Sequence, residues 1–214
     1  MQDEATGCKA AAIVRGGGEL GTAVAYALHK AGLRVLVVDR PLPGALRLGA
    51  AFAAAAVSGC AVVGGVAAVH CATRAQCEAA WRRGEVPLWT GPEDDLGLRP
   101  ELLVDARMRG VHGPRAHMDE APLVVGIGPG FEAGRDVHLV IESNRGPRLG
   151  QVLSRGSAEP HTGIPGEVMG HREERVRRAP CAGRMERARE LGDFVAAGDV
   201  VATVAGEPVR ARIG

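Results

Sequence analysis

Residues 10–39 read AAAIVRGGGELGTAVAYALHKAGLRVLVVD, and their pattern determines the fold that we expect. The apolar run 10–14 is typical of a buried parallel strand, and 33–38 is a second run of the same kind. Between them, 20–31 has the apolar spacing of a helix, which Gly32 ends. A strand, a helix and a strand within about thirty residues indicate a β-α-β unit with a parallel sheet.

Three glycines join the first strand to the helix with the spacing G-x-G-x-x-G. The first glycine permits a tight turn, the second lets the backbone approach a pyrophosphate, and the third lets helix and strand pack closely. An acidic residue at the end of the second strand can bind ribose hydroxyls, and the helix N-terminus attracts an anion. We therefore predict a nucleotide-type site; the alternative is that these glycines serve only the turn and the packing. The residues of this predicted site are Gly16, Gly17, Gly18, Glu19, Gly21 and Asp39.

Further along the chain, strands and helices continue to alternate up to about residue 110. Helices are expected at 45–57 and from Thr73 to Arg83, and apolar strands at 60–63, 66–71, 86–89 and 102–105. After that point glycine and proline recur, with strands expected at 123–127, 136–142 and 151–153. The sequence thus predicts an α/β chain in three parts: a Rossmann-like nucleotide-binding domain at 1–110, a β-rich glycine-loop domain at 111–177 and a small all-β tail at 178–214.

Composition excludes several classes of protein. Lys plus Arg is 26 and Asp plus Glu is 25, which is not the strongly basic balance of a dedicated nucleic-acid-binding protein. The five cysteines are scattered without a C-x-x-C pair, so neither a disulfide framework nor a cysteine zinc site is expected. The first residues lack the apolar segment of a signal peptide, and the most apolar window, 45–69, is too rich in glycine and alanine for a membrane span. We therefore expect a cytoplasmic protein.

A second group of residues with suitable chemistry follows residue 105. Asp105 ends an apolar strand, where α/β sheets place ligand contacts, although it could equally cap a turn. The loop at 126–131, with Gly128 and Gly130, can direct backbone N–H groups toward one anion. Three side chains on the next predicted strand alternate and therefore share a face, where they could transfer protons or hold a metal ion of unknown identity; the alternative is that they face water. The candidate catalytic residues are Asp105, Asp136, His138 and Glu142, and Asn144 and Arg145 follow as candidate ligand-binding residues.

Taken together, these motifs resemble the selenium-dependent molybdenum hydroxylase accessory family, of YqeB type. The resemblance lies in 14–20 (VRGGGEL), 103–108 (LVDARM), 126–131 (GIGPGF), 136–138 (DVH), 141–146 (IESNRG) and 156–166 (GSAEPHTGIPG). It implies an accessory or maturation role for hydroxylases related to xanthine dehydrogenase. Such a role implies a hydroxylase as partner and, as ligand, a nucleotide or the molybdenum cofactor as a nucleotide-bearing molybdopterin.

The sequence departs from this family pattern at several positions. Members usually have Asp where Glu19 stands and Asn where His161 stands, and 109–113 replaces a lysine-rich stretch. The tail resembles half of a biotinyl/lipoyl-type barrel, and no lysine occupies the turn around Gly206 to carry a cofactor. Such a half barrel would leave strand edges open unless another chain or the middle domain covers them. Two further alternatives follow: a homo-oligomer formed through the tail, or a scaffold that docks a partner through it.

The alternative function is that of an NAD(P)-dependent oxidoreductase. The glycine motif with Asp39 favours it, and Arg40 leaves open which of the two nicotinamide cofactors would bind. Against it stands the lack of a second-domain hydride-transfer constellation, because the one tyrosine, Tyr26, lies in the first predicted helix. The arginine-rich run at 171–178 could bind RNA or phosphate, but without an aromatic platform we interpret it as a solvated linker or a β-sheet edge.

Overall fold

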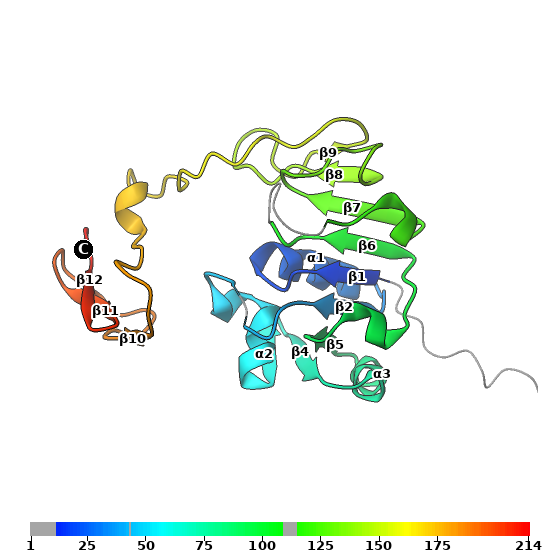
Figure 1. The fold of residues 1–214 in the computed structure, drawn as a ribbon, viewed down its shortest axis with the longest axis horizontal. Coiled ribbons are helices and arrows are strands. Elements are labelled where there is room, and N and C mark those ends of the chain that lie inside the picture. The colour runs from blue at the N-terminus through cyan, green and yellow to red at the C-terminus, as the bar shows by residue number, and fades with distance from the viewer. Residues whose placement is uncertain (1–11, 43, 109–114) are drawn as a thin grey trace, which may run out of the picture. The chain divides into compact units, whose positions relative to one another are not determined.

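A computed structural model describes residues 12–42, 44–108 and 115–214 of the chain (Figure 1). The chain forms two compact units, Met1–His161 and Thr162–Gly214. The first two residues of the expected strand at 10–14 lie outside the described part, and its residues 12–14 lie within it. Cys8 and the stretch 109–113, where the sequence departs from the family pattern, also lie outside it. Among the described residues, no helix is both long and apolar enough to cross a membrane.

The first unit is built on a mostly parallel sheet with the strand order β3-β4-β5-β2-β1-β6-β7-β8-β9. The seven strands from β4 to β8 in this order are mutually parallel, and β3 and β9 pair antiparallel at the two edges. In chain order the strands are β1 (Ala12–Arg15), β2 (Val35–Val38), β3 (Cys60–Val63), β4 (Val66–Cys71), β5 (Val86–Trp89), β6 (Leu102–Asp105), β7 (Leu123–Ile127), β8 (Leu139–Ile141) and β9 (Val152–Leu153).

Both faces of the sheet are buried at its central strands, where alternate residues of a strand enter one of two cores. One core places Ala12, Val14 and their neighbours against α1 (Glu19–Lys30) and α2 (Ala55–Ser58). The other places Ile13 and Leu36 against α3 (Arg74–Arg82). The expected capping residue is confirmed, because the Thr73 hydroxyl accepts a hydrogen bond from the Gln76 N–H at 3.2 Å. Short 3₁₀ turns lie at η1 (Leu48–Ala50), η2 (Phe52–Ala54), η3 (Glu93–Leu96), η4 (Met118–Glu120) and η5 (Glu173–Arg175).

The expected long helix at 45–57 is wrong. The structure replaces it with η1, η2 and the single turn α2. The reason is tertiary: the Phe52 N–H donates to the Thr22 hydroxyl at 2.8 Å, and the Ala53 N–H donates to the Gly17 carbonyl at 2.9 Å. N–H groups bonded in this way cannot join a regular helical ladder, so contact with the glycine loop overrides the helix propensity of alanine.

The second unit contains a small antiparallel sheet of the order β10-β11-β12. Its strands are β10 (Met185–Arg187), β11 (Val200–Val204) and β12 (Glu207–Arg210). A two-residue turn joins β11 to β12, and Ala205 (φ 49°) and Gly206 (φ 87°) both have the left-handed conformation that such a hairpin requires. Val204 of β11 and Val209 of β12 are buried, whereas Leu191 and Phe194 are exposed.

The predicted fold class is confirmed as a mixed α/β chain with a large, mostly parallel sheet and a separate small antiparallel sheet at the C-terminal side. The parts are divided differently from the three domains proposed from sequence. β6 and β7 pair across the expected boundary at 110, and β7, β8 and β9 continue the same sheet. The structure divides the chain between His161 and Thr162.

Candidate functional site

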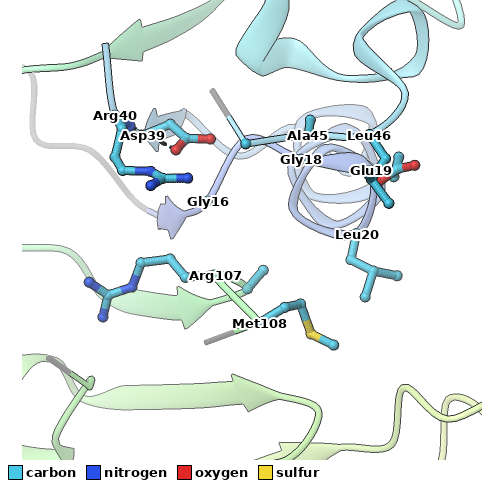
Figure 2. A pocket seen from close by; sticks show the side chains of 12 residues that line it. Gly16, Gly18, Glu19, Leu20, Asp39, Arg40, Ala45, Leu46, Arg107 and Met108 are labelled. Atoms are coloured by element: carbon cyan, nitrogen blue, oxygen red, sulfur yellow. Dashed lines mark hydrogen bonds between the residues drawn. The ribbon is translucent and has the colours of Figure 1, made fainter. Parts of the chain in front are cut away.

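A pocket lies at the carboxyl ends of the parallel strands, where the connections that follow β1 and β6 lead to opposite sides of the sheet. The chain leaves β1 toward β2 on one side, while β6 lies on the other side of β1. Such a switch point is where open α/β sheets bind ligands. Here the loop at Gly16, Gly18 and Glu19 and the segment at Arg107 and Met108 border a cavity of about 260 Å³ (Figure 2).

Two of the three motif glycines are required by the fold itself. Gly16 has a φ of 100°, and a Cβ added there would lie 2.9 Å from the Ala106 carbonyl oxygen. A Cβ on Gly21 would lie 1.7 Å from the carbonyl oxygen of Gly16. The tight turn and the close contact between helix and strand therefore explain both of these glycines without a ligand.

Gly18 differs, because neither backbone conformation nor packing requires a glycine there. Its φ of −67° and ψ of −174° are extended values that any residue adopts. Among the described residues, an added Cβ would meet only the Ala45 Cβ, at an ordinary 3.9 Å. Gly18 lines the cavity, so the absence of a side chain keeps space open inside it. Gly18 has no side chain to cap α1, so within the described part of the chain the first N–H groups of the helix have no N-cap side-chain acceptor.

The remaining loop residue, Gly17, is held on both sides. Its carbonyl accepts bonds from the Thr22 hydroxyl at 3.0 Å and the Ala53 N–H at 2.9 Å. Its N–H donates to the Asp39 carboxylate at 2.7 Å, and the other oxygen of that carboxylate accepts the Arg40 N–H at 2.7 Å. Asp39 thus braces the glycine loop, and its binding of ribose hydroxyls stays a prediction.

The two ends of the pocket have different chemistry (Figure 2). Arg40 and Arg107 lie at one end, and Leu20, Leu46 and Met108 lie at the other. The Leu46 side chain is almost fully exposed, at 97%. Glu19 lies at the apolar end and pairs loosely with Arg47, at 3.8 Å. A ligand with an anionic group and a flat apolar ring would match both ends.

Asp105 fixes Arg107 at the border of this pocket. The Asp105 side chain is buried, and its two oxygens accept bonds from the Arg107 Nε at 2.9 Å and Nη2 at 2.5 Å. The Ala116 N–H also donates to it, at 3.2 Å. With both oxygens bonded, Asp105 is placed to position Arg107, and its predicted catalytic role stays untested.

A network that the sequence analysis missed lies beside the same loop. Arg15, the residue before Gly16, donates to Glu93 at 2.8 Å and to Glu120 at 2.6 Å. Burial opposes the charge of Arg15, but its hydrogen bonds to the two carboxylates outweigh burial and raise its pKa. The pKa of Glu120 is lowered although burial opposes its charge, because Arg15 and the His117 N–H donate to it. No local motif could have revealed residues so distant in sequence.

The structure does not join Asp136, His138 and Glu142 into one group. β8 begins only at Leu139, so Asp136 and His138 lie in the turn before it. Asp136 accepts the Glu132 N–H at 2.9 Å and pairs with Arg135, whereas the His138 Nδ1 accepts the Val124 N–H at 3.0 Å. Across the described residues, no three His, Cys, Asp or Glu side chains are arranged to hold a metal ion.

Glu142 instead connects two loops. Its side chain is 1% exposed, and its oxygens accept the Asn144 N–H and the Glu159 N–H, each at 2.7 Å. Burial would raise the pKa of Glu142, but these bonds and one from the Ser143 N–H outweigh it, so its pKa lies below its ordinary value. The Asn144 side chain donates to the Glu159 carboxylate at 2.6 Å, and Arg145 is exposed.

Backbone conformation and packing also account for the glycines of the second loop, at 126–131. Gly128 has a φ of 75°, and its N–H donates to the Ile141 carbonyl at 2.8 Å. A Cβ on Gly128 would lie 2.5 Å from the Ser143 hydroxyl and 3.0 Å from the end of Met108. Gly130 has a φ of 107°, and its carbonyl accepts a bond from Arg115 at 2.5 Å. Anion binding by this loop stays a prediction.

Comparison with known proteins finds a relative that is similar over most of this chain. The chain is similar to the uncharacterized protein YqeB of Escherichia coli (strain K12), with 40% identity over 204 residues that cover 94% of this chain. The chain spans 37% of the length of that relative. No family model matches the chain, and no solved structure matches it. A similarity of this extent supports the YqeB-type relationship that the motifs predicted.

Proposed function

We propose that the chain binds a nucleotide, or a nucleotide-bearing molybdopterin, beside Gly18 and acts as an accessory protein in the maturation of selenium-dependent molybdenum hydroxylases. The observation that carries the binding proposal is Gly18 itself. It lines the cavity with space for a side chain and with ordinary backbone angles, so the fold does not explain the glycine. A ligand group that occupies this space does.

The phosphate of such a ligand would lie along the glycine loop from Gly16 to Gly18, toward the arginine end of the pocket and away from the Glu19 carboxylate (Figure 2). The helix dipole and the uncapped N–H groups there favour an anion. Arg107 is already oriented by Asp105, and Arg40 has no hydrogen bond or ion pair from its guanidinium within the described residues, so both can donate to phosphate oxygens. The ring of a base or pterin would contact the apolar end at Leu20 and Met108.

The maturation role rests on the resemblance in the motifs and on the similarity to YqeB. It implies that the bound ligand is delivered to, or modified for, a hydroxylase partner. Because the chain spans 37% of the length of the relative, the activity of the whole protein is part of the proposal. The pocket lies at the carboxyl ends of the central strands next to exposed apolar side chains such as Leu46, which suits a ligand that is later released.

Isothermal titration with nucleoside mono- and diphosphates, molybdopterin cytosine dinucleotide and inorganic phosphate tests the binding proposal. Gly18→Val should abolish binding while the protein stays folded. The matched control is Gly146→Val, because Gly146 also has open space and no left-handed φ but does not line the pocket. Unchanged affinity of Gly18→Val for every ligand would refute the site. Failure of ligand-loaded protein to raise the activity of a cofactor-free molybdenum hydroxylase would refute the maturation role.

An NAD(P)-dependent oxidoreductase is the second candidate, favoured by the position of Asp39 at the end of β2 beside the glycine loop. Tyr26 and Lys30 have the spacing of a catalytic Tyr-x-x-x-Lys pair, but they lie in the second half of α1, whereas the pocket adjoins its first residue. The Tyr26 ring lies against Gly64. A change in nicotinamide absorbance with a small carbonyl compound would establish this candidate, and binding of molybdopterin without nicotinamide would exclude it.

A further inference from the structure

The arginine-rich run at 171–178, in the second unit, divides into two sets with different partners. The first arginines hold their own loop closed. Val168 and His171 pair through their backbones, Arg172 pairs with Glu167 at 3.0 Å, and the Arg175 Nε donates to the His171 carbonyl at 3.2 Å. Arg175 also donates to the carbonyl of Gly166. These arginines are therefore structural.

The next two arginines are not used in this way. Within the described part of the chain, the side chains of Arg177 and Arg178 have no hydrogen bond or ion pair. Both line a cavity of about 310 Å³, together with Arg212 from beyond the last strand. A solvated linker explains a run of neighbouring arginines, but it does not explain a distant third arginine in the same cavity.

The position of Arg212 is set by the sheet of this unit. The residue before it, Ala211, donates its N–H to the Asp199 carbonyl and accepts the Gly198 N–H, both at 2.9 Å. These two bonds continue the pairing of β12 beside the start of β11 and hold residue 211 in place. The third guanidinium therefore comes from an ordered segment.

The charges of the cavity are not balanced by its acidic neighbours. Glu173 is the acidic residue among those that line it, so one carboxylate stands against the three arginines of the lining, which is net positive. Glu174 is turned to its own loop, where its own N–H and that of Arg172 donate to its carboxylate and keep its pKa below the ordinary value. Arg212 adds a smaller attraction to the same carboxylate.

We infer that this cavity is a second anion site, which binds the phosphate group of a small phosphorylated molecule. Planar guanidinium groups donate paired hydrogen bonds to phosphate oxygens, and three of them around one cavity match a doubly charged phosphate. The volume of about 310 Å³ exceeds what one phosphate fills, so part of an attached group also fits. Glu173 can accept a hydrogen bond from a hydroxyl of that group. The inference is independent of the pocket at Gly18.

Titration of the full chain with inorganic pyrophosphate, by calorimetry at low and at high salt, tests this site. The background is Gly18→Val, which removes the proposed nucleotide site. Arg178→Ala and Arg212→Ala should each weaken binding by about tenfold or more, since each removes hydrogen bonds to a charged group. Arg184→Ala is the matched control, because Arg184 is exposed, does not line the cavity and has no ion pair or side-chain hydrogen bond among the described residues. It should leave the affinity unchanged.

Three results would overturn the inference. The first is equal weakening by Arg184→Ala, which would mean that only the total charge of the unit matters. The second is loss of pyrophosphate binding in Gly18→Val alone, which would place the anion in the first unit. The third is a protein that binds citrate or a single-stranded oligonucleotide but does not bind pyrophosphate, which would indicate a surface for carboxylates or for nucleic acid. Pyrophosphate binding that resists Gly18→Val and is lost in Arg212→Ala supports the site.

Discussion

Gly21 packs so closely over Gly16 that a side chain on Gly21 would begin 1.7 Å from the Gly16 carbonyl oxygen. Both partners of this overlap are backbone, so no rotation of a side chain can relieve it. We expect Gly21→Ala to lower the free energy of unfolding of the first unit by about 3 kcal/mol or more, since helix and strand must separate. Urea unfolding followed by tryptophan fluorescence measures this, because Trp81 and Trp89 both lie in that unit.

Gly18→Ala is the control for this prediction. An added methyl group meets only Ala45, at 3.9 Å, and the backbone angles suit alanine. We expect a change within about 1 kcal/mol, because alanine also reduces the freedom of the unfolded chain. If Gly18→Ala destabilised the first unit as much as Gly21→Ala, the fold would require Gly18, and the reason to place a ligand there would be lost.

Arg40 provides a test of the anionic end of the pocket. It is exposed beside the cavity, and its guanidinium has no hydrogen bond or ion pair among the described residues, so its removal should not affect folding. We expect Arg40→Ala to weaken binding of a phosphate-bearing nucleotide by about tenfold, measured by calorimetry, while binding of the free nucleoside is unchanged. Arg82→Ala, at the exposed end of α3, removes the same charge away from the pocket and should change neither. Equal losses in both variants would indicate a general effect of charge.

Most of the sheet was predictable because its strands are short apolar runs between glycine, proline and polar residues that limit them locally. The expected strands at 60–63, 66–71, 86–89, 102–105 and 123–127 coincide with β3 to β7. The helix at 45–57 was not predictable, since alanine has high helix propensity and the contact that prevents the helix involves Thr22 and Gly17. Local pattern determines a helix only where the N–H groups of that segment find their partners within it.

The candidate site shows the same division. The order of glycines between a strand and a helix was enough to predict the turn at Gly16 and the contact at Gly21. The partners of the charged residues were not predictable, because a period of two along the chain placed Asp136, His138 and Glu142 on one face of a strand that starts only at residue 139. The pairing of Arg15 with Glu93 and Glu120 depends on the order of strands in the sheet.

Glu142 should make stability depend on pH in the acidic range. Its pKa in the folded protein lies below its ordinary value, because N–H donors outweigh its burial. Its contribution is therefore fully present above the unfolded pKa of about 4.3 and is lost as the pH falls through the lower folded pKa. We expect Glu142→Gln to cost about 1–3 kcal/mol at neutral pH, because an amide cannot accept bonds at both atoms.

Urea unfolding of wild type and Glu142→Gln at several pH values below 7 measures this difference. The gap between the two proteins should begin to narrow as the pH falls below the unfolded pKa of about 4.3, because the carboxylate of the unfolded chain takes up its proton before that of the folded protein. The difference isolates Glu142 from other acids with lowered pKa values, such as Asp136 and Glu120, which both proteins retain. A gap that stays constant down to pH 2 would mean that the charge of Glu142 does not stabilise the two loops.

His138 tests whether the second group of candidate residues is structural or chemical. Its Nδ1 accepts the N–H of buried Val124, so the ring serves as a hydrogen-bond acceptor between β7 and the start of β8. His138→Phe leaves that N–H without its partner and should cost about 1–2 kcal/mol in urea unfolding. His138→Asn places an amide oxygen near the position of Nδ1 and should recover most of this loss. Both variants should bind the nucleotide as wild type does; loss of ligand binding or of hydroxylase activation in folded His138→Asn would show instead that the imidazole takes part in the chemistry.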